Sequence, residues 1–254
     1  MQIHHLRNAT FVIEVNDKFI LVDPMLGKKA SMQAFTAVRF KPIKNPLVEL
    51  PSNSAGILEK VTHCLITHLH PDHLDEEGIR FLKDKNIPVF CSINDVKALQ
   101  KNELNIEKAL DYWKKETFFD GIIIGIPAVH GYGPIAEQMG NVMGFYMEFL
   151  NEKSIYISSD TVYTDDVHKV LKELQPDISV LAGGSAQLDE GEPILMTMKD
   201  LIQFIQDSPH KIYANHLEAL NHCPTTRIEL KEAAKKHSLQ HKVFIPDDGE
   251  SILF

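Results

Sequence analysis

The feature that most constrains this chain is a short apolar run that leads into a cluster of histidines. Residues 61–67 read Val-Thr-His-Cys-Leu-Ile-Thr, and the six residues that follow are His68, Leu69, His70, Pro71, Asp72 and His73. A short apolar run of this kind predicts a buried strand, and Pro71 sets a bend after it. Imidazole and carboxylate are common ligands of zinc and similar cations. The stretch therefore predicts a metal site at the end of a strand.

An accidental cluster of surface histidines is the alternative interpretation of this stretch. The whole chain has 13 histidines among 254 residues. Three of them together with an aspartate rarely fall within six residues by chance, so the motif has a low risk of being a false positive.

Length and composition indicate a soluble globular protein of the α/β class. A chain of 254 residues suits one large domain or two small ones. No linker, repeat or low-complexity segment divides it, so we expect a single domain over residues 1–254. The formal net charge of −9 disfavours binding to long nucleic acids, which requires cationic surfaces.

The cysteines and the N-terminal segment favour a reducing compartment. Cys64, Cys91 and Cys223 are too few and too scattered for a disulfide framework. Residues 1–15 lack the charged and apolar regions of a secretion signal, and the apolar stretch 121–129 is too short to cross a bilayer. We expect a cytoplasmic protein without a membrane partner. Homo-oligomerisation stays open.

The hydrophobic pattern predicts alternating strands and helices along the chain. A hairpin is expected over 10–23, and further strands over 88–91, 121–126, 142–150, 154–159, 177–182, 211–214, 242–245 and 251–254. Helices are expected over 75–85, from 92, from 164 to 175, from 197 and from 226, the second and the last two opened by capping boxes. The pattern over 104–120 is unclear.

Candidate ligands follow the ends of four predicted strands. His68 follows the first, and His130, Asp160 and His216 each follow another. A lone histidine or aspartate in such a position is usually structural. Because strand ends of layered α/β folds collect functional groups, the recurrence favours one shared site.

The order of these residues resembles that of the metallo-β-lactamase superfamily over nearly the whole chain. The resemblance implies a four-layer αβ/βα sandwich with two divalent metal ions between its sheets. Zinc is the expected metal, with manganese or iron as alternatives. In this family His68, His70 and His130 would hold the first ion, Asp72, His73 and His216 the second, and Asp160 would bridge them.

The C-terminal part resembles bacterial hydrolases related to ascorbate-phosphate lactonase. The segment 215–224 reads Asn-His-Leu-Glu-Ala-Leu-Asn-His-Cys-Pro, and Arg227 and the segment 247–250 follow. Ser159 replaces the glycine that usually precedes the bridging aspartate, which alters either the pocket or only the turn. His70 stands where the diiron flavoprotein branch has glutamate, and the chain has no room for the extra domain of the ribonuclease-type members.

Several further residues have two interpretations each. Asp72 is expected to orient the attacking hydroxide or to move a proton, and His222 to transfer a proton or only to pack. Arg227 would bind an anionic substrate group or form local ion pairs. Asp23 would accept a hydrogen bond from a ligating histidine or stabilise a turn. The segment 25–52, with five cationic side chains, would cover the site and offer cations to an anionic substrate, or form a solvated connection.

The leading functional hypothesis is a hydrolase that uses a metal-bound hydroxide. A pair of ions lowers the pKa of a water molecule to near neutrality, and the hydroxide attacks a carbonyl or phosphoryl centre. The expected substrate is a small ester, lactone or phosphorylated metabolite, with an anionic group as one option. The alternatives are a phosphodiesterase or nuclease, and a noncatalytic metal-binding sensor of the same fold.

Overall fold

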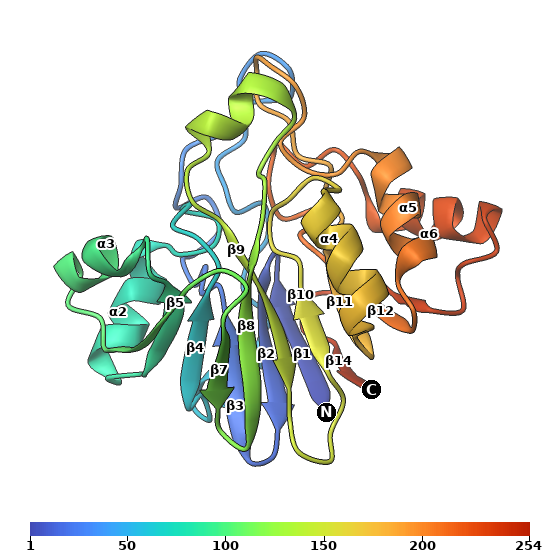
Figure 1. Cartoon of the computed structure of the whole chain (residues 1–254). Helices are drawn as coiled ribbons and strands as arrows, with labels where there is room; N and C mark the ends of the chain where they lie inside the picture. The colour runs from blue at the N-terminus through green and yellow to red at the C-terminus, as the bar shows by residue number, and fades with distance from the viewer.

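Two seven-stranded sheets packed face to face form the centre of the protein (Figure 1). The structure is a computed structural model that describes residues 1–254. The first sheet has the order β14-β1-β2-β3-β4-β5-β6. Its strands are β1 (Gln2–Arg7), β2 (Thr10–Val15), β3 (Lys18–Val22), β4 (His63–Ile66), β5 (Val89–Ser92), β6 (Ile106–Leu110) and β14 (Ser251–Leu253).

The second sheet has the order β13-β12-β11-β10-β9-β8-β7. Its strands are β7 (Lys115–Phe118), β8 (Gly121–Pro127), β9 (Met143–Glu148), β10 (Ile155–Ile157), β11 (Ile178–Ala182), β12 (Lys211–Asn215) and β13 (Val243–Phe244). The strands β10, β11 and β12 are parallel, as are β3, β4 and β5. Because carboxyl ends of parallel strands share one edge of a sheet, the loops after them collect there.

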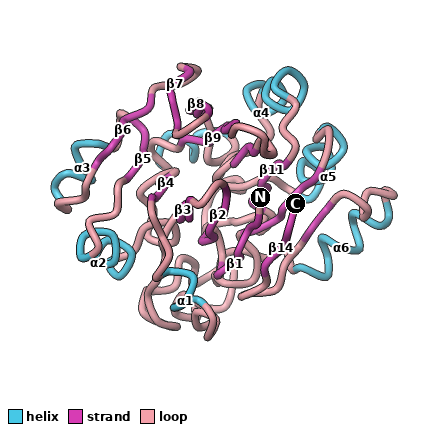
Figure 2. The backbone as a smooth tube through the Cα atoms, turned by 90° about the horizontal axis from the view of Figure 1, so that it is seen from below, coloured by secondary structure: helices cyan, strands magenta, loops and turns pink.

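Helices cover the outer faces of both sheets (Figure 2). They are α1 (Ser54–Leu58), α2 (Glu76–Asp84), α3 (Val96–Lys101), α4 (Asp165–Lys169), α5 (Met198–Asp207) and α6 (Arg227–Lys236), with a π-helical turn η2 (Val170–Leu174) after α4 and a 3₁₀ helix η1 (Gly133–Gln138). The helices α2 and α3 lie beside the first sheet, and α4, α5 and α6 beside the second. The predicted αβ/βα sandwich is confirmed. No helix is long and apolar enough to cross a membrane.

The main core lies between the two sheets. Phe11, Ile13 and Leu65 from the first sheet pack in one buried cluster with Phe145 and Ile157 from the second. Smaller apolar clusters lie beneath the helices on each side. The sheets are therefore fixed relative to one another by apolar burial, which stabilises a Phe or Ile side chain by roughly 1.5–3 kcal/mol each.

Most strands with a clear apolar pattern were predicted, and three strands were not. The hairpin over 10–23 is present as β2 and β3, and the segment 154–159 contains β10. The prediction missed β1, β6 and β7. The strands β6 and β7 are each the last in their sheet, and their sequences, IEKAL and KETF, carry the charged residues that edge strands tolerate.

The predicted capping boxes had different outcomes. Thr226 and Glu229 form a complete capping box at the start of α6, as predicted. The box proposed from Ser92 to Asp95 was wrong, because Ser92 ends β5 and Asp95 takes the N-cap position without a side-chain cap. Thr197 does occupy the N-cap of α5, but its hydroxyl donates to Asp200 instead of accepting from the helix backbone.

Candidate metal centre

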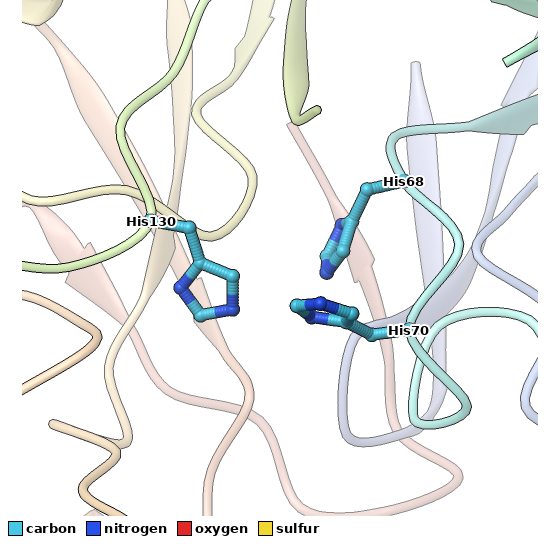
Figure 3. Close-up of side chains that lie close together, drawn as sticks. All are labelled: His68, His70 and His130. Atoms are coloured by element: carbon cyan, nitrogen blue, oxygen red, sulfur yellow. The ribbon is translucent and has the colours of Figure 1, made fainter. Parts of the chain in front are cut away.

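Three histidines from two loops converge at the edge of the sheets. His68 and His70 follow β4, and His130 follows β8. Their ligand atoms lie within 4.8 Å of one another, and the three rings point toward a common centre (Figure 3). His68 and His130 are buried, whereas His70 is only partly buried. Three imidazoles in this arrangement suit a zinc site that keeps a further position open.

A second group of candidate ligands lies beside the first. It consists of Asp72, His73, Asp160 and His216, all buried, with ligand atoms again within 4.8 Å of one another. The distances from Asp160 Oδ2 are 3.2 Å to His73 Nε2 and 3.4 Å to His216 Nε2. The same oxygen lies 3.5 Å from His130 Nε2 in the first group, so one carboxylate contacts both groups.

Several polar atoms at this centre are buried without a hydrogen-bond partner. They are the Nε2 atoms of His68, His73 and His216 and Oδ1 of Asp160. A buried polar atom without a partner costs about 1–3 kcal/mol. Cations bound among these atoms would remove that cost. The residues present therefore fit divalent metal ions.

The outer ring nitrogens fix the orientation of these histidines. His73 Nδ1 lies 2.8 Å from Asp23 Oδ2, His68 Nδ1 lies 2.9 Å from Thr67 Oγ1, and His130 Nδ1 lies 2.7 Å from the Ile194 carbonyl oxygen. Each bond turns Nε2 toward the centre, as in many metal sites. Asp23 also accepts hydrogen bonds from the Thr67 amide and hydroxyl, which favours the first of its two interpretations, that of an acceptor behind a candidate ligand.

The two groups differ in the pKa of their histidines. Burial lowers the pKa of His130 to about 4, so this imidazole is neutral and free to bind a cation. Burial also opposes protonation of His73, but the carboxylates of Asp160 and Asp23 outweigh it and raise the pKa to about 10. In the metal-free protein the second group therefore holds protons, which bound cations would replace.

Asn8 supports the second group and was missed by the sequence analysis. Its side-chain amide donates to the backbone carbonyl of Asp72 at 3.0 Å, and its backbone carbonyl accepts from the backbone amide of His216 at 2.9 Å. Asn8 is fully buried and has a φ of 56°, a conformation that asparagine tolerates. The only signal in the sequence is an asparagine between two apolar runs, which is too common to predict this role.

The segment 25–52 lies against the candidate site. The ring of Phe35 packs edge-on against His222, with centroids 4.8 Å apart. Asn221 fixes this segment, because its side chain accepts from the Phe35 amide and donates to the Thr36 and Lys41 carbonyls. The placement favours a cover of the site over a plain connection.

The cations of this segment do not line the site. The side chains of Lys28, Lys29, Lys41 and Lys44 are exposed to solvent, and Arg39 donates to the Gln187 side chain and to the carbonyl of Gly191. The buried cation is Arg7, which donates to the carbonyls of Met25, Gly27 and Val48. Its role is to hold the segment in place.

The two remaining candidate residues have different surroundings. His222 is buried and its ring centroid lies 6.4 Å from that of His216, close enough to the centre for a part in catalysis. Arg227 donates to Glu218, Asp248 and the carbonyl of Pro246. These bonds favour the local ion pairs, so the predicted contact of Arg227 with substrate stays a prediction without structural support.

Ser159 adopts a backbone conformation that explains why a glycine is usual at this position. Its φ is 60°, in the left-handed region that glycine occupies without steric cost. The side chain is buried and its hydroxyl has no hydrogen-bond partner. The serine therefore keeps the turn before Asp160 and adds a hydroxyl group there.

Comparison with known proteins identifies relatives over the whole chain. The family model described as "Beta-lactamase superfamily domain" matches residues 18–215. The UPF0173 protein YddR of Bacillus subtilis (strain 168) is 34% identical over 258 residues and is covered completely, as is this chain. A UPF0173 metal-dependent hydrolase of Roseobacter denitrificans is 27% identical and covers 74% of this chain and 76% of its own length.

Solved structures agree with this relationship. An isothiocyanate hydrolase from Delia radicum gut bacteria has a TM-score of 0.91 and 31% identity, covering 100% of this chain and 99% of its own. A possible metal-dependent hydrolase from Veillonella parvula DSM 2008 also has a TM-score of 0.91, with 28% identity, covering 99% of this chain and 98% of its own.

Proposed function

Because this chain belongs to the beta-lactamase superfamily and to its metal-dependent hydrolases, we propose that it hydrolyses a small molecule with the help of two divalent metal ions. Zinc is the proposed metal, with manganese or iron as alternatives. His68, His70 and His130 would hold one ion. Asp72, His73 and His216 would hold the other, and Asp160 would serve both.

The position of Asp160 carries this proposal. Its Oδ2 lies within 3.5 Å of histidines from both groups, and a carboxylate has two oxygens whereas an imidazole offers one nitrogen to one ion. A negative group between two cations reduces their repulsion. This placement supports two neighbouring ions over a single one.

The chain itself supplies orientation and proton transfer. When bound, the two ions would polarise the substrate and favour ionisation of a water molecule. Asp72 lies at the centre, with its Oδ2 3.4 Å from His216 Nε2, and would orient that water or accept a proton. The buried His222 would donate a proton to the leaving group. Burial of these groups strengthens each electrostatic contact.

We expect two metal ions per chain. Metal-free protein reloaded with zinc and freed of excess metal should give this stoichiometry by elemental analysis, because seven candidate ligands in two adjoining groups suffice for two ions. The same protein with His70→Ala and His73→Ala combined removes one ligand from each group and serves as the reference for nonspecific binding. A stoichiometry that stays at one with ample zinc would refute the dinuclear proposal.

Several substrate classes are compatible with the proposed hydrolase. The resemblance of the C-terminal segment to lactonase-like hydrolases supports a small ester, lactone or phosphorylated metabolite. There are two alternatives: a phosphodiesterase acting on small diesters, and a noncatalytic metal-binding sensor. The net charge of −9 argues against long nucleic acids as substrates. The lysines of segment 25–52 face the solvent, which argues against a cover that binds anions. The three buried free cysteines support a cytoplasmic location.

A second candidate substrate is an isothiocyanate. The supporting observations are the related isothiocyanate hydrolase at 31% identity over nearly both full chains and an apolar cluster that includes Cys223. Met32 and Phe35 of segment 25–52 are partly buried against this cluster, together with Ile135, Met139 and Leu188 from other loops. Addition of one water molecule to R–N=C=S would give the amine R–NH₂ and carbonyl sulfide, and attack on the central carbon suits the same metal chemistry.

A substrate screen separates these candidates. We expect zinc-loaded protein to turn over uncharged small substrates, with benzyl isothiocyanate, a γ-lactone, a p-nitrophenyl ester and bis-p-nitrophenyl phosphate compared at equal concentration. The metal-free protein is the matched control, and formation of the amine, the hydroxy acid or p-nitrophenol is measured. Cleavage of the phosphodiester above all others would favour the alternative enzyme. Absence of turnover by fully loaded protein would favour the sensor.

A further inference from the structure

One candidate ligand has an outer hydrogen-bond partner unlike the others. The Nδ1 atoms of His68, His73 and His130 face oxygen atoms of a hydroxyl, a carboxylate and a carbonyl group. The Nδ1 atom of His216 instead faces the sulfur of Cys223, at 3.5 Å. No other hydrogen bond reaches the His216 ring nitrogens, so this sulfur is the partner that orients the ring.

The direction of this hydrogen bond follows from the other side of the ring. His216 Nε2 lies 3.4 Å from the carboxylate oxygens of Asp72 and of Asp160, so Nε2 is the nitrogen turned toward the proposed metal ions. A nitrogen that binds a metal carries no proton, and the proton of a neutral imidazole then resides on Nδ1. Nδ1–H therefore donates and the Cys223 sulfur accepts.

The backbone around Cys223 leaves the sulfur little freedom to move. Cys223 is buried, and the segment after β11 passes directly over it. A Cβ atom added at Gly184 would lie 3.0 Å from both Cβ and Sγ of Cys223 and 2.3 Å from the His216 carbonyl oxygen. The absence of a side chain at Gly184 thus permits the backbone to press Cys223 against His216, and the amide of Thr225 bonds to the Gly184 carbonyl on the other side.

We propose that Cys223 is a positioning residue for the second metal ion, which acts by holding His216 with Nε2 directed at the centre. The inference rests on the proposed function, because it takes His216 as a ligand. It gives this buried thiol a role that neither Cys64 nor Cys91 shares, since those two lie within strands β4 and β5 in an apolar cluster. The Nδ1 atom of His222 lies 3.9 Å from the same sulfur, so the thiol also separates the two imidazoles.

The consequence of losing the sulfur is confined to one site. In Cys223→Ala the buried Nδ1–H of His216 has no acceptor, and the ring is free to rotate away from the centre. Loss of an outer hydrogen-bond partner of a ligating histidine typically weakens metal binding about 10–100-fold. In the first group His68 and His130 keep their own partners, and this group should bind its ion as before. Serine offers an oxygen acceptor of similar size and should restore most of the affinity.

Cobalt(II) titration of the full-length protein tests this proposal. Metal-free wild type, Cys223→Ala, Cys223→Ser and the matched control Cys91→Ala are titrated, with visible absorption reporting binding and anomalous diffraction locating each ion. We expect the dissociation constant of the ion at the second group to rise about 10–100-fold in Cys223→Ala and to stay near the wild-type value in Cys223→Ser and Cys91→Ala. Binding at the first group should be unchanged in all four proteins.

The outcomes separate this proposal from the dinuclear one. Two ions bound equally well by wild type and Cys223→Ala would overturn the role of Cys223 and leave the dinuclear centre standing. A wild type that binds one ion at the three histidines would overturn both. If Cys223→Ala does not fold, long-range ¹H–¹⁵N spectra of zinc-loaded wild type and Cys223→Ser decide. His216 Nδ1 must carry a proton in the wild type, with a resonance that moves in Cys223→Ser, and an unprotonated Nδ1 overturns the proposal.

Discussion

Replacement of His70 by alanine is expected to abolish hydrolysis and to leave the fold intact. His70 lies in the loop after β4, is the one partly exposed member of its group and has no part in a strand or helix. Loss of an outer partner of a metal ligand already costs about 10–100-fold in activity, so loss of the ligand itself should cost at least about 100-fold. The free energy of unfolding of the metal-free protein should change by no more than about 0.5 kcal/mol, as for surface substitutions.

The measurement compares turnover, zinc content and thermal unfolding of the variant with those of His210→Ala. His210 is an exposed histidine without a hydrogen bond in the loop between α5 and β12, so its loss controls for the removal of an imidazole as such. Native circular dichroism together with lost turnover is the expected pair of results. Full activity of the His70 variant would remove it from the set of ligands.

The parts of this centre that could be predicted are those that the local sequence determines. His68, His70, Asp72 and His73 fall within six residues behind an apolar strand, so their proximity needs no knowledge of the fold. His130, Asp160 and His216 are separated from them by 57 to 148 residues, counted from 130 − 73 and 216 − 68. Their place in the site could be predicted because buried strands end just before each of them, and functional groups of layered α/β folds collect at strand ends.

The parts that could not be predicted depend on contacts between distant segments. Asn8 forms hydrogen bonds with Asp72 and His216, which lie 64 and 208 residues away. No pattern in the sequence near Asn8 predicts either bond. The choice between the two interpretations of Arg227 also depends on such contacts. Its position at the start of a helix allows an anion-binding role or local ion pairs, and the folded chain places Glu218 and Asp248 on its donors.

Secondary structure also divides into elements that the local sequence predicts and elements that depend on distant contacts. The central strands are apolar along their length, whereas β6 and β7 border one other strand each and carry Glu and Lys, so hydrophobic periodicity does not reveal them. The start of α3 was predicted too early for a related reason. Ser92 can cap a helix, but in the structure it is the last residue of β5 and pairs with Leu110 of β6. This pairing takes precedence over local capping chemistry.

Replacement of Asp160 by asparagine is expected to weaken the second metal site more than the first. The amide keeps the shape of the side chain but removes its negative charge. The first group would retain three imidazoles, sufficient for a zinc site completed by water. The second would retain Asp72, His73 and His216, but its ion would face a neighbouring cation with no charge between them, and such repulsion is strong in a buried site.

The expected size of this effect follows from the loss of one charged ligand at a buried centre. The zinc dissociation constant of the second site should rise at least about 100-fold, more than the 10–100-fold expected for loss of an outer partner. The first site should weaken much less. Metal titration of the variant, with each ion located by anomalous diffraction, measures both constants.

Asp84→Asn provides the matched control for this variant. Asp84 is exposed at the end of α2 and forms no hydrogen bond or ion pair through its side chain, so the same chemical change there should leave both constants at their wild-type values. An equal rise at the two sites, or no rise at either, would show that Asp160 does not bridge the ions. In that case its contact with histidines of both groups would reflect only the turn that follows β10, and Asp72 would be the carboxylate that determines affinity at the second site.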